Sequence, residues 1–435
     1  MGGHLFFLAL FALLVVGIHA AVSDTTAFPS CAIACDNQLF LDCSLSNNTS
    51  CFCASDSRPT ALLDCVESIC TTKEFFTTKR LYEKECDIPP LKGPPVVKVS
   101  TLIPFILASV FFVARMIAKS SGLAGGWGWD DYTIIVSYVL GVAIYVLDIY
   151  SKPAAPMSDL TGKSNKSVIR NGFGRNIWDL PFPTITRFYQ YFQAVAVMYK
   201  IQISLAKISV CLFLLRIFQS RTFRYLAYAL MGINAAIGIT WASADAFRCV
   251  PTRLTWTGWT NEESGYCINF IVAVLVNCLV NIFVDFILIF MPVYEVVKLQ
   301  LPLRKKIAVA SMFIVGSVLT IIAIIRVVVF WNNRWGANET LGLYPLMHWS
   351  VIECQISVMC ACLPASRALI GRWCPGLLGG SSYRKTESHA AEYYHKKSTG
   401  SVNINKSVTY TVNYESRSAT HSDVELVDID PKHEK

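Results

Sequence analysis

Two long apolar runs separated by a short basic segment constrain this chain more than any other feature. They cover residues 268–292 and 307–331. A helix of about 25 residues is long enough to cross a hydrocarbon layer of about 30 Å. Lys298, Arg304, Lys305 and Lys306 lie between the two runs. Because Lys and Arg are retained on the cytoplasmic side during insertion, this segment predicts a cytoplasmic turn. The hairpin therefore predicts a membrane protein and sets the expected orientation of every other segment.

Composition supports the membrane assignment and argues against nucleic acid as a partner. The chain has 435 residues, of which 53% are hydrophobic and 16% charged, and its net charge is +8. A soluble protein is rarely so apolar, and membrane spans explain the excess. No basic patch interleaved with aromatic residues is present, and many cations lie beside apolar runs, where they set orientation. The expected partner is the lipid membrane.

Seven apolar segments follow one another along the chain. They cover residues 96–118, 132–150, 188–218, 225–247, 268–292, 307–331 and 346–370. If the amino terminus is outside, the short basic turns near Lys119, at residues 221–224 and at residues 298–306 all fall inside. We therefore expect an all-α membrane domain at residues 96–370, in the plasma membrane, with an extracellular amino terminus and a cytoplasmic carboxyl terminus.

One loop disagrees with the charge rule. The segment 151–187 is expected outside, yet it carries six cations, and a long loop is translocated whatever its charge. Other marks support the expected side. Asn165 and Asn338 begin glycosylation sequons in predicted outer loops, and Cys249 and Cys267 flank a third such loop, where we expect a disulfide.

The amino-terminal region has the marks of a secreted, cross-linked module. Residues 5–18 form an apolar core of signal-peptide length, so residues 1–20 are expected to be removed, with a membrane anchor as the alternative. Eight cysteines lie within residues 28–87. A unit of this size buries too little surface to be secure alone, which favours disulfides over a zinc site. A proline-rich linker is predicted at residues 88–97. Residues 371–435 are predicted to form a disordered cytoplasmic tail.

The cysteine spacing resembles that of the CFEM module of fungal extracellular proteins. The shared pattern is Pro-x-Cys-Ala-x2-Cys from Pro29, then Cys-x-Cys at residues 51–53, then three closing cysteines. The resemblance implies a small helical module with four disulfides: Cys31–Cys70, Cys35–Cys65, Cys43–Cys51 and Cys53–Cys86.

Some CFEM proteins bind haem through an Asp three residues before the fourth cysteine. This chain has Asn48 there, and a neutral amide is a poor iron ligand, so no metal or cofactor is expected. Asn47 and Asn48 each begin a glycosylation sequon, in agreement with an outside location.

Charged side chains recur within the predicted spans. Lys200 and Lys207 lie on one helical face of the third span, and Asp285 lies with two Asn residues on one face of the fifth. Arg326 and Glu353 lie in the sixth and seventh spans. A charge at bilayer depth costs about 2.5–3.5 kcal/mol, so these groups are expected to face inward. We expect the pairs Lys207–Asp285 and Arg326–Glu353.

Three roles stay open for this intramembrane network. Buried ion pairs can fix helix register only, they can exchange partners as a switch when a ligand binds, or they can line a proton or ion pathway. Asp130 and Asp131, at the inner mouth of the second span, are interpreted as helix-capping residues.

The seven spans resemble the fungal rhodopsin-like integral membrane family. The shared residues are Asp130, Asp131, Gly172, Gly174, Trp178, Lys207, Ser209, Arg216, Ile217, Phe218, Cys249, Pro251, Trp256, Cys267, Asp285, Pro292, Leu299, Lys306, Gly316, Arg326, Glu353, Cys360, Cys362 and Pro364. The family includes surface-sensing receptors of plant-pathogenic fungi, some with a CFEM module. The resemblance implies a receptor similar to G-protein-coupled receptors that senses host-surface or nutrient cues, with a role in virulence and a heterotrimeric G protein or other cytoplasmic partner.

Several other functions lack the residues they need. A light-driven rhodopsin needs a Schiff-base Lys in its last span, and residues 346–370 contain none. His348 stands alone, and no Gly-x-Ser-x-Gly, His-Glu-x-x-His or phosphate-loop motif is present, so an enzyme is not expected. A transporter or channel that uses the charged interior is the first alternative to a receptor, and a haem- or iron-binding surface protein is the second.

Overall fold

The computed structural model describes residues 27–40, 52–54, 57–91, 94–95, 97–123, 125–151, 174–298, 303–333 and 338–373. All of them belong to the first of two compact units, Met1–Gly380; the second unit is Ser381–Lys435. The predicted signal peptide and nearly all of the predicted tail lie outside the described residues.

The predicted all-α fold with seven membrane-spanning helices is confirmed. Seven helices of the described chain are long and apolar enough to cross a membrane. They are α6 (Val99–Ser120), α7 (Trp129–Ser151), α8 (Phe182–Ile217), α9 (Arg221–Ala246), α11 (Phe270–Lys298), α12 (Leu303–Asn333) and α13 (Glu339–Trp373). The chain is therefore a multi-pass membrane protein.

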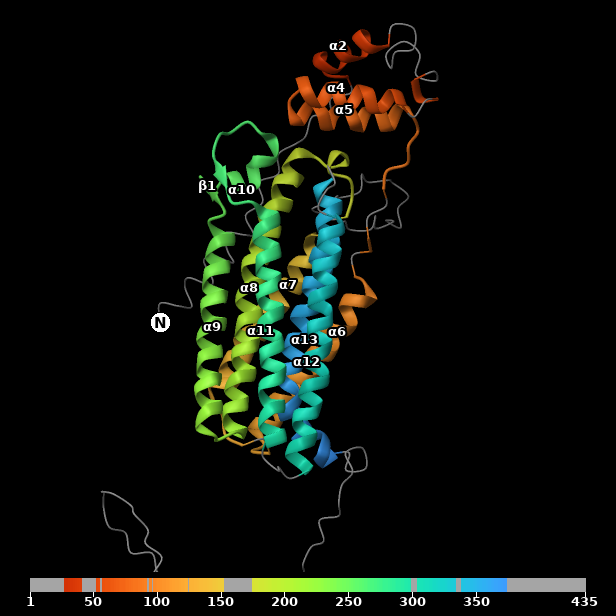
Figure 1. Ribbon diagram of the computed structural model, residues 1–435. Coiled ribbons are helices and arrows are strands. Elements are labelled where there is room, and N and C mark those ends of the chain that lie inside the picture. Colours follow the sequence, from red (N-terminus) through yellow and green to blue (C-terminus); the bar gives the residue numbers. More distant parts are fainter. Residues whose placement is uncertain are drawn as a thin grey trace, which may run out of the picture. The chain divides into compact units, whose positions relative to one another are not determined.

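The seven helices run side by side (Figure 1). Helix α8 packs against α7 and α9, α11 packs against α9 and α12, and α13 packs against α6, α7, α8 and α12. Of the seven, α13 is the most deeply buried. Large apolar side chains remain exposed on the outside of the bundle, including Val110, Val139, Ile239, Phe283 and Ile321. An exposed apolar surface of this extent fits contact with lipid rather than with water.

Five helices begin earlier than their hydrophobicity predicts, and the difference is largest for α8 and α13. Helix α8 begins at Phe182 rather than 188. Pro181 is its N-cap, and Pro183 lies in its first turn, where a backbone N–H has no partner within the helix and a proline is therefore tolerated. Helix α13 begins at Glu339 rather than 346 and includes Pro345. The extra residues at the start of each helix are too polar to be recognised from the sequence as part of a membrane span.

Between α9 and α11 lies a small irregular segment that the sequence does not predict. It contains helix α10 (Leu254–Thr257), the 3₁₀ helix η2 (Gly258–Thr260) and an antiparallel sheet of β1 (Cys249–Val250) and β2 (Tyr266–Cys267). Cys249 and Cys267 are directly opposite each other in the sheet and form the expected disulfide. A second 3₁₀ helix, η1 (Ile177–Asp179), precedes α8.

The amino-terminal module, residues 27–91, is built from α2 (Ser30–Leu39), α4 (Ser57–Ile69) and α5 (Thr72–Glu85). Phe52, Leu62 and Val66 are buried at its centre. Thr71 and Glu74 form a capping box that starts α5. Disulfides join Cys31 to Cys70, Cys35 to Cys65 and Cys53 to Cys86, as the CFEM resemblance implies. The fourth implied pair, Cys43–Cys51, lies outside the described residues.

Candidate functional site

The amino-terminal module docks on one end of the helix bundle, here called the module end. Arg80 of α5 donates hydrogen bonds to the backbone oxygens of Trp178 and Leu180, each at 2.6 Å. The indole Nε1 of Trp178 donates to Glu83 at 2.8 Å, and the ammonium of Lys79 lies 3.6 Å from the centre of the Trp178 ring. Helix α5 is therefore held to η1 by directed contacts from three of its residues, within little more than one helical turn.

A second set of contacts joins the module to the segment between α9 and α11. The ring of Phe76 stacks on Trp259, with centroids 6.1 Å apart. Lys73 forms an ion pair with Glu262 at 2.6 Å, and Asn261 donates to Thr72 at 3.4 Å. The Lys73–Glu262 pair is exposed and contributes little, so the aromatic stacking and the Arg80 contacts carry most of the docking.

Two carboxyl groups at this interface have perturbed pKa values. Burial raises the pKa of Glu83 above its ordinary value of 4.5; the hydrogen bond from Trp178 acts against burial, and Asp179 adds to it. Burial also raises the pKa of Asp179, against the hydrogen bond from Asn176 and the charge of Arg80. Docking therefore favours the protonated forms of both groups.

A cavity of about 980 Å³ lies where the module, the irregular segment and the helices meet. Its walls come from α5 and the end of α4, from α10 and the sheet, and from the module-end parts of α8, α11, α12 and α13. Seven aromatic residues of the described chain line it: Phe75, Phe76, Tyr189, Phe192, Trp259, Phe270 and Phe330. Its volume is at the upper end of the range for small-molecule sites in proteins.

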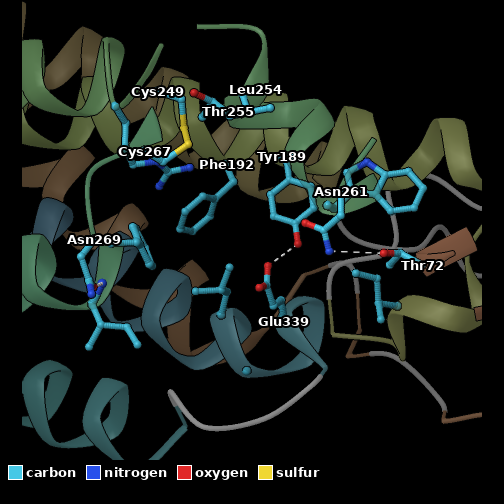
Figure 2. Close-up of a pocket in the computed structure, with 18 of the residues that line it drawn as sticks. Thr72, Tyr189, Phe192, Cys249, Leu254, Thr255, Asn261, Cys267, Asn269 and Glu339 are labelled. Carbon is cyan, nitrogen blue, oxygen red and sulfur yellow. Dashed lines mark hydrogen bonds between the residues drawn. A yellow bond between two sulfur atoms is a disulfide. The ribbon is translucent and has the colours of Figure 1, made fainter. Parts of the chain in front are cut away.

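Tyr189 and Glu339 connect two helices across this cavity. The hydroxyl of Tyr189 on α8 donates a hydrogen bond to the carboxylate of Glu339 at the start of α13. Figure 2 shows the two side chains pointing toward each other, with the Phe192 ring between this contact and the Cys249–Cys267 disulfide. A group bound in the cavity would contact both helices at once.

Arg248 supplies a positive charge to the same cavity. Its guanidinium lies 4.9 Å from the centre of the Phe270 ring. Burial lowers the pKa of Arg248, and the negative charges of Asp245 and Glu339 oppose that effect. Within the part of the chain that the structure describes, Arg248 forms no ion pair, so its donors face the cavity without a carboxylate partner.

Farther along α8, the intramembrane charges meet the partners that their helical spacing predicts. Lys207 Nζ lies 2.9 Å from Asp285 Oδ1 and donates to the side-chain and backbone oxygens of Asn281, at 3.0 and 3.3 Å. Lys200 donates to Asn277 at 2.5 Å. These contacts join α8 to α11.

Arg326 and Glu353 form a second buried ion pair, between α12 and α13. Arg326 Nε lies 3.1 Å from Glu353 Oε2, and another guanidinium nitrogen lies 3.2 Å from the sulfur of Cys278. Tyr199 of α8 donates to Glu353 at 2.9 Å, and its ring lies 4.7 Å from the guanidinium carbon of Arg326. All of the network faces the interior of the bundle, and the contacts of Tyr199 connect α8 to both α12 and α13.

At the opposite end, here called the distal end, a five-residue charge cluster joins α6, α7 and α8. Arg115 contacts Asp130 and Asp131 at 2.6 and 2.7 Å, and Lys119 contacts Asp131 at 2.9 Å. Arg216 contacts Asp130 at 3.1 Å. Four of these side chains are buried, whereas that of Arg216 is 39% exposed. We call these residues the distal cluster.

The interpretation of Asp130 and Asp131 as helix caps is incomplete. Asp131 does accept a hydrogen bond from the backbone of Gly128 at 3.0 Å, as a cap would. The shorter contacts with Arg115 and Lys119 show that both carboxylates also neutralise buried cations. Arg115 further donates to the backbone oxygen of Ala361 at 2.6 Å, which connects the cluster to α13.

Of the predicted glycosylation sites, Asn47, Asn48 and Asn165 lie outside the described residues. Asn338 accepts a hydrogen bond from the backbone of Ile177 at 3.0 Å and donates to Asn176 at 2.8 Å. Thr340, which completes the sequon, is fully buried and donates to the backbone oxygen of Arg175. In this structure the Asn338 side chain holds η1 against the start of α13.

The described cysteines do not form a metal site. Cys31, Cys70 and Glu74 lie close enough together to hold an ion, but the two cysteines are joined in a disulfide and offer no thiolate. The position at which some CFEM proteins carry a haem ligand, Asn48, lies outside the described residues, and its neutral amide does not fit that role.

Comparisons with known proteins agree with this architecture. The profile of the fungal rhodopsin domain matches residues 114–372, and that of the CFEM domain matches residues 24–87. No solved structure is detectably similar to the chain.

Three curated relatives show the extent of the similarity. The polyenoic acids biosynthesis gene cluster protein Ba17b of Metarhizium anisopliae is 26% identical over 210 residues, which is 46% of this chain and 57% of that protein. A SAT4 family membrane protein of Emericella nidulans is 27% identical over 175 residues, 40% of this chain and 43% of that protein. Receptor GIN3 of Arthrobotrys oligospora is 24% identical over 259 residues, 59% of this chain and 58% of that protein.

The chain thus spans about half the length of these relatives. The fungal rhodopsin match covers more than half of this chain, from the end of α6 to the end of α13, and includes the intramembrane pairs and the distal cluster. The chain therefore belongs to the fungal rhodopsin domain family of multi-pass membrane proteins and carries a CFEM domain ahead of its seven helices.

Proposed function

We propose that this protein is a plasma-membrane receptor that binds an extracellular molecule at the module end and signals to a cytoplasmic partner at the distal end. The observation that carries the proposal is that one helix, α8, contributes residues to the cavity, to the intramembrane network and to the distal cluster. It carries Tyr189 at the cavity, Lys207 in the intramembrane network and Arg216 in the distal cluster. At about 1.5 Å per residue, these positions span roughly 40 Å along one helix.

The proposed orientation rests on chemistry at the two ends. Disulfides form in oxidising compartments, and every disulfide of the described chain lies in the module or at the module end. Arg304, Lys305 and Lys306 belong to the first residues of α12, at its end away from the module, beside the segment where the sequence predicts a cytoplasmic turn. The module is therefore extracellular in this proposal.

Signalling would follow from a shift between two arrangements of the helices. A ligand can move such an equilibrium only if it binds one arrangement more tightly than the other. The cavity allows this, because its lining comes from α8, α11, α12 and α13 together. At the distal end the half-exposed Arg216 is the cluster member that a cytoplasmic protein can reach, and we propose a heterotrimeric G protein or another signalling partner there.

The name of one relative, receptor GIN3, supports a receptor function over the alternatives. The transporter alternative would need a path past Lys207 and Asp285. Beside that pair the described residues leave a space of about 50 Å³, enough for a few water molecules. A role in sensing host surfaces, and hence in virulence, remains a prediction from the family resemblance.

The test is a comparison of signalling and transport in the same cells. We expect a change in cAMP or MAP-kinase output when cells carrying the wild-type protein meet a hydrophobic surface, and loss of that change in Asp285→Asn. If Asp285→Asn instead abolished uptake of a solute while the signalling response persisted, the receptor proposal would be wrong.

A further inference from the structure

Among the described residues, four charged side chains line the module-end cavity: Arg248, Glu67, Glu263 and Glu339. Glu263 is paired with Arg253, whereas Arg248 and Glu339 are not paired with each other. Arg248 lies beside the sheet, and Glu339 lies at the start of α13; both line the same 980 Å³ space. The guanidinium of Arg248 is placed over the Phe270 ring, and the carboxylate of Glu339 accepts a hydrogen bond from Tyr189. Each charge is thus held in place by a contact that does not neutralise it.

Each group also retains hydrogen-bonding capacity. A guanidinium has five N–H donors in a planar fork that matches a carboxylate, and a cation–π contact uses none of them. A carboxylate has about four acceptor positions, of which Tyr189 fills one. A ligand that presents an anion to Arg248 and a cation to Glu339 would therefore form charge-assisted hydrogen bonds with both.

The remainder of the cavity is suited to a ring-bearing body. Phe75 and Phe76 come from the module, Trp259 from η2, and Phe192 and Phe330 from the helix bundle. Aromatic faces bind rings by stacking and edge contacts and also surround ammonium groups favourably. The volume accommodates a molecule of several rings or a few amino-acid residues.

We propose that the cavity binds a zwitterionic ligand of the amino-acid or short-peptide class with an aromatic side chain. Its terminal carboxylate pairs with Arg248, its ammonium group pairs with Glu339, and its ring packs among the aromatic residues. The module is part of the site, because Thr72, Phe75 and Phe76 form one wall. This inference rests on the proposed receptor function, whose extracellular ligand it assigns to a chemical class.

Four matched probes test the proposal: the dipeptide Phe-Phe, its N-acetyl form, its carboxyl-terminal amide, and the form with both ends capped. Binding of each to the purified full chain in lipid nanodiscs is measured by calorimetry. Losing one charge-assisted contact is expected to weaken binding about tenfold or more, so the free dipeptide should bind best and the doubly capped form worst.

Two variants test which residue binds which terminus of the dipeptide. Arg248→Gln should abolish the preference for a free carboxylate and leave the preference for a free amine, and Glu339→Gln should do the reverse. Arg224→Gln and Glu85→Gln, at exposed positions that do not line the cavity, are the matched controls and should bind all four probes as the wild type does.

Equal binding of the free and N-acetyl forms would overturn the proposal in favour of an anionic ligand, and equal binding of the free and amide forms would do so in favour of a cationic one. Failure of every free-ended aromatic dipeptide to bind at millimolar concentration would also overturn it. Because binding is measured on the isolated protein, these outcomes are independent of signalling. A protein that binds the free dipeptide without altering cellular output would retain this ligand site and lose the receptor function.

Discussion

Arg216 forms an ion pair with Asp130 at 3.1 Å, and its side chain is 39% exposed whereas that of Asp130 is 2% exposed. The other cations that contact Asp130, Arg115 and Lys119, are buried. Arg216 also donates to the backbone oxygen of Gly126 at 2.8 Å, so it holds the end of α8 to the segment before α7. Of the contacts in the distal cluster, this one can be released without leaving Asp130 unpaired.

Arg216→Gln is therefore expected to raise signalling in the absence of ligand. A partly exposed ion pair contributes up to about 1 kcal/mol, which corresponds to about a fivefold change in an equilibrium between two states. The measurement is basal cAMP or MAP-kinase output at matched surface expression. Lys84→Gln removes another exposed cation, in the amino-terminal module, and should have no effect. Unchanged basal output in Arg216→Gln would remove the distal cluster from the signalling mechanism.

Lys207 and Asp285 test whether buried charge pairing matters for folding alone or also for function. Lys207→Met leaves Asp285 buried without its cation and is expected to destabilise the fold by about 3–5 kcal/mol. Lys207→Met combined with Asp285→Leu removes both charges and should recover most of that loss. Thermal unfolding in detergent measures the stability of each protein. A stable double variant that still signals normally would assign the pair a purely structural role.

Docking of the amino-terminal module should depend on pH through Glu83 and Asp179. Because docking raises the pKa of both groups, the docked state binds more protons than the undocked state. Docking is therefore strongest below their ordinary values, near pH 4, and weakens as the pH rises through the raised values. Burial lowers the pKa of Lys79 from its ordinary value of 10.5, and the negative charges of Glu83 and Glu67 oppose that effect.

Resistance of residues 72–85 to proteolysis, followed from pH 4 to 7, measures this effect. Glu83→Gln keeps an acceptor for Trp178 but cannot titrate, so protease resistance should depend less on pH in this variant than in the wild type. A profile unchanged by Glu83→Gln would mean that this carboxyl group stays ionised in the docked state.

The disulfide between Cys249 and Cys267 should stabilise the wall of the cavity. It closes a loop with a sequence separation of 18, for which the expected stabilisation is about 3 kcal/mol. Replacing both cysteines with Ala should make residues 250–266 exchange amide hydrogens faster while the helices keep their protection. Equal exchange in the two proteins would show that contacts with the module, such as the stacking of Phe76 on Trp259, hold this segment without the disulfide.

Different parts of this structure were accessible to sequence reasoning for different physical reasons. The spans and the pairs Lys207–Asp285 and Arg326–Glu353 follow from helical periodicity and from the cost of an unpaired charge in lipid, both of which are local or pairwise. The cavity does not follow, because its walls come from parts of the chain that are distant in sequence. Glu339 in particular lies before the predicted start of the seventh span, in a segment too polar to be recognised as part of it.

Arg115 is an example of a missed residue. It lies inside the first apolar run, and its charge was a signal that Asp130 and Asp131 needed a cation from another span. The capping interpretation satisfies both carboxylates within their own helix and therefore predicts no partner from another span. The structure shows Arg115 fully buried against both of them.

The central claim is that the cavity and the distal cluster are coupled through the helix bundle. Hydrogen exchange of the backbone amide of Gly128, which donates to Asp131 in the distal cluster, reports directly on that end. Removing the charge that Tyr189 contacts, with Glu339→Gln, should change the exchange rate at residues 125–131 several-fold in the full chain, whereas Glu85→Gln should leave it unchanged. An identical exchange rate in wild type and Glu339→Gln would show that the two ends behave independently and would contradict the account.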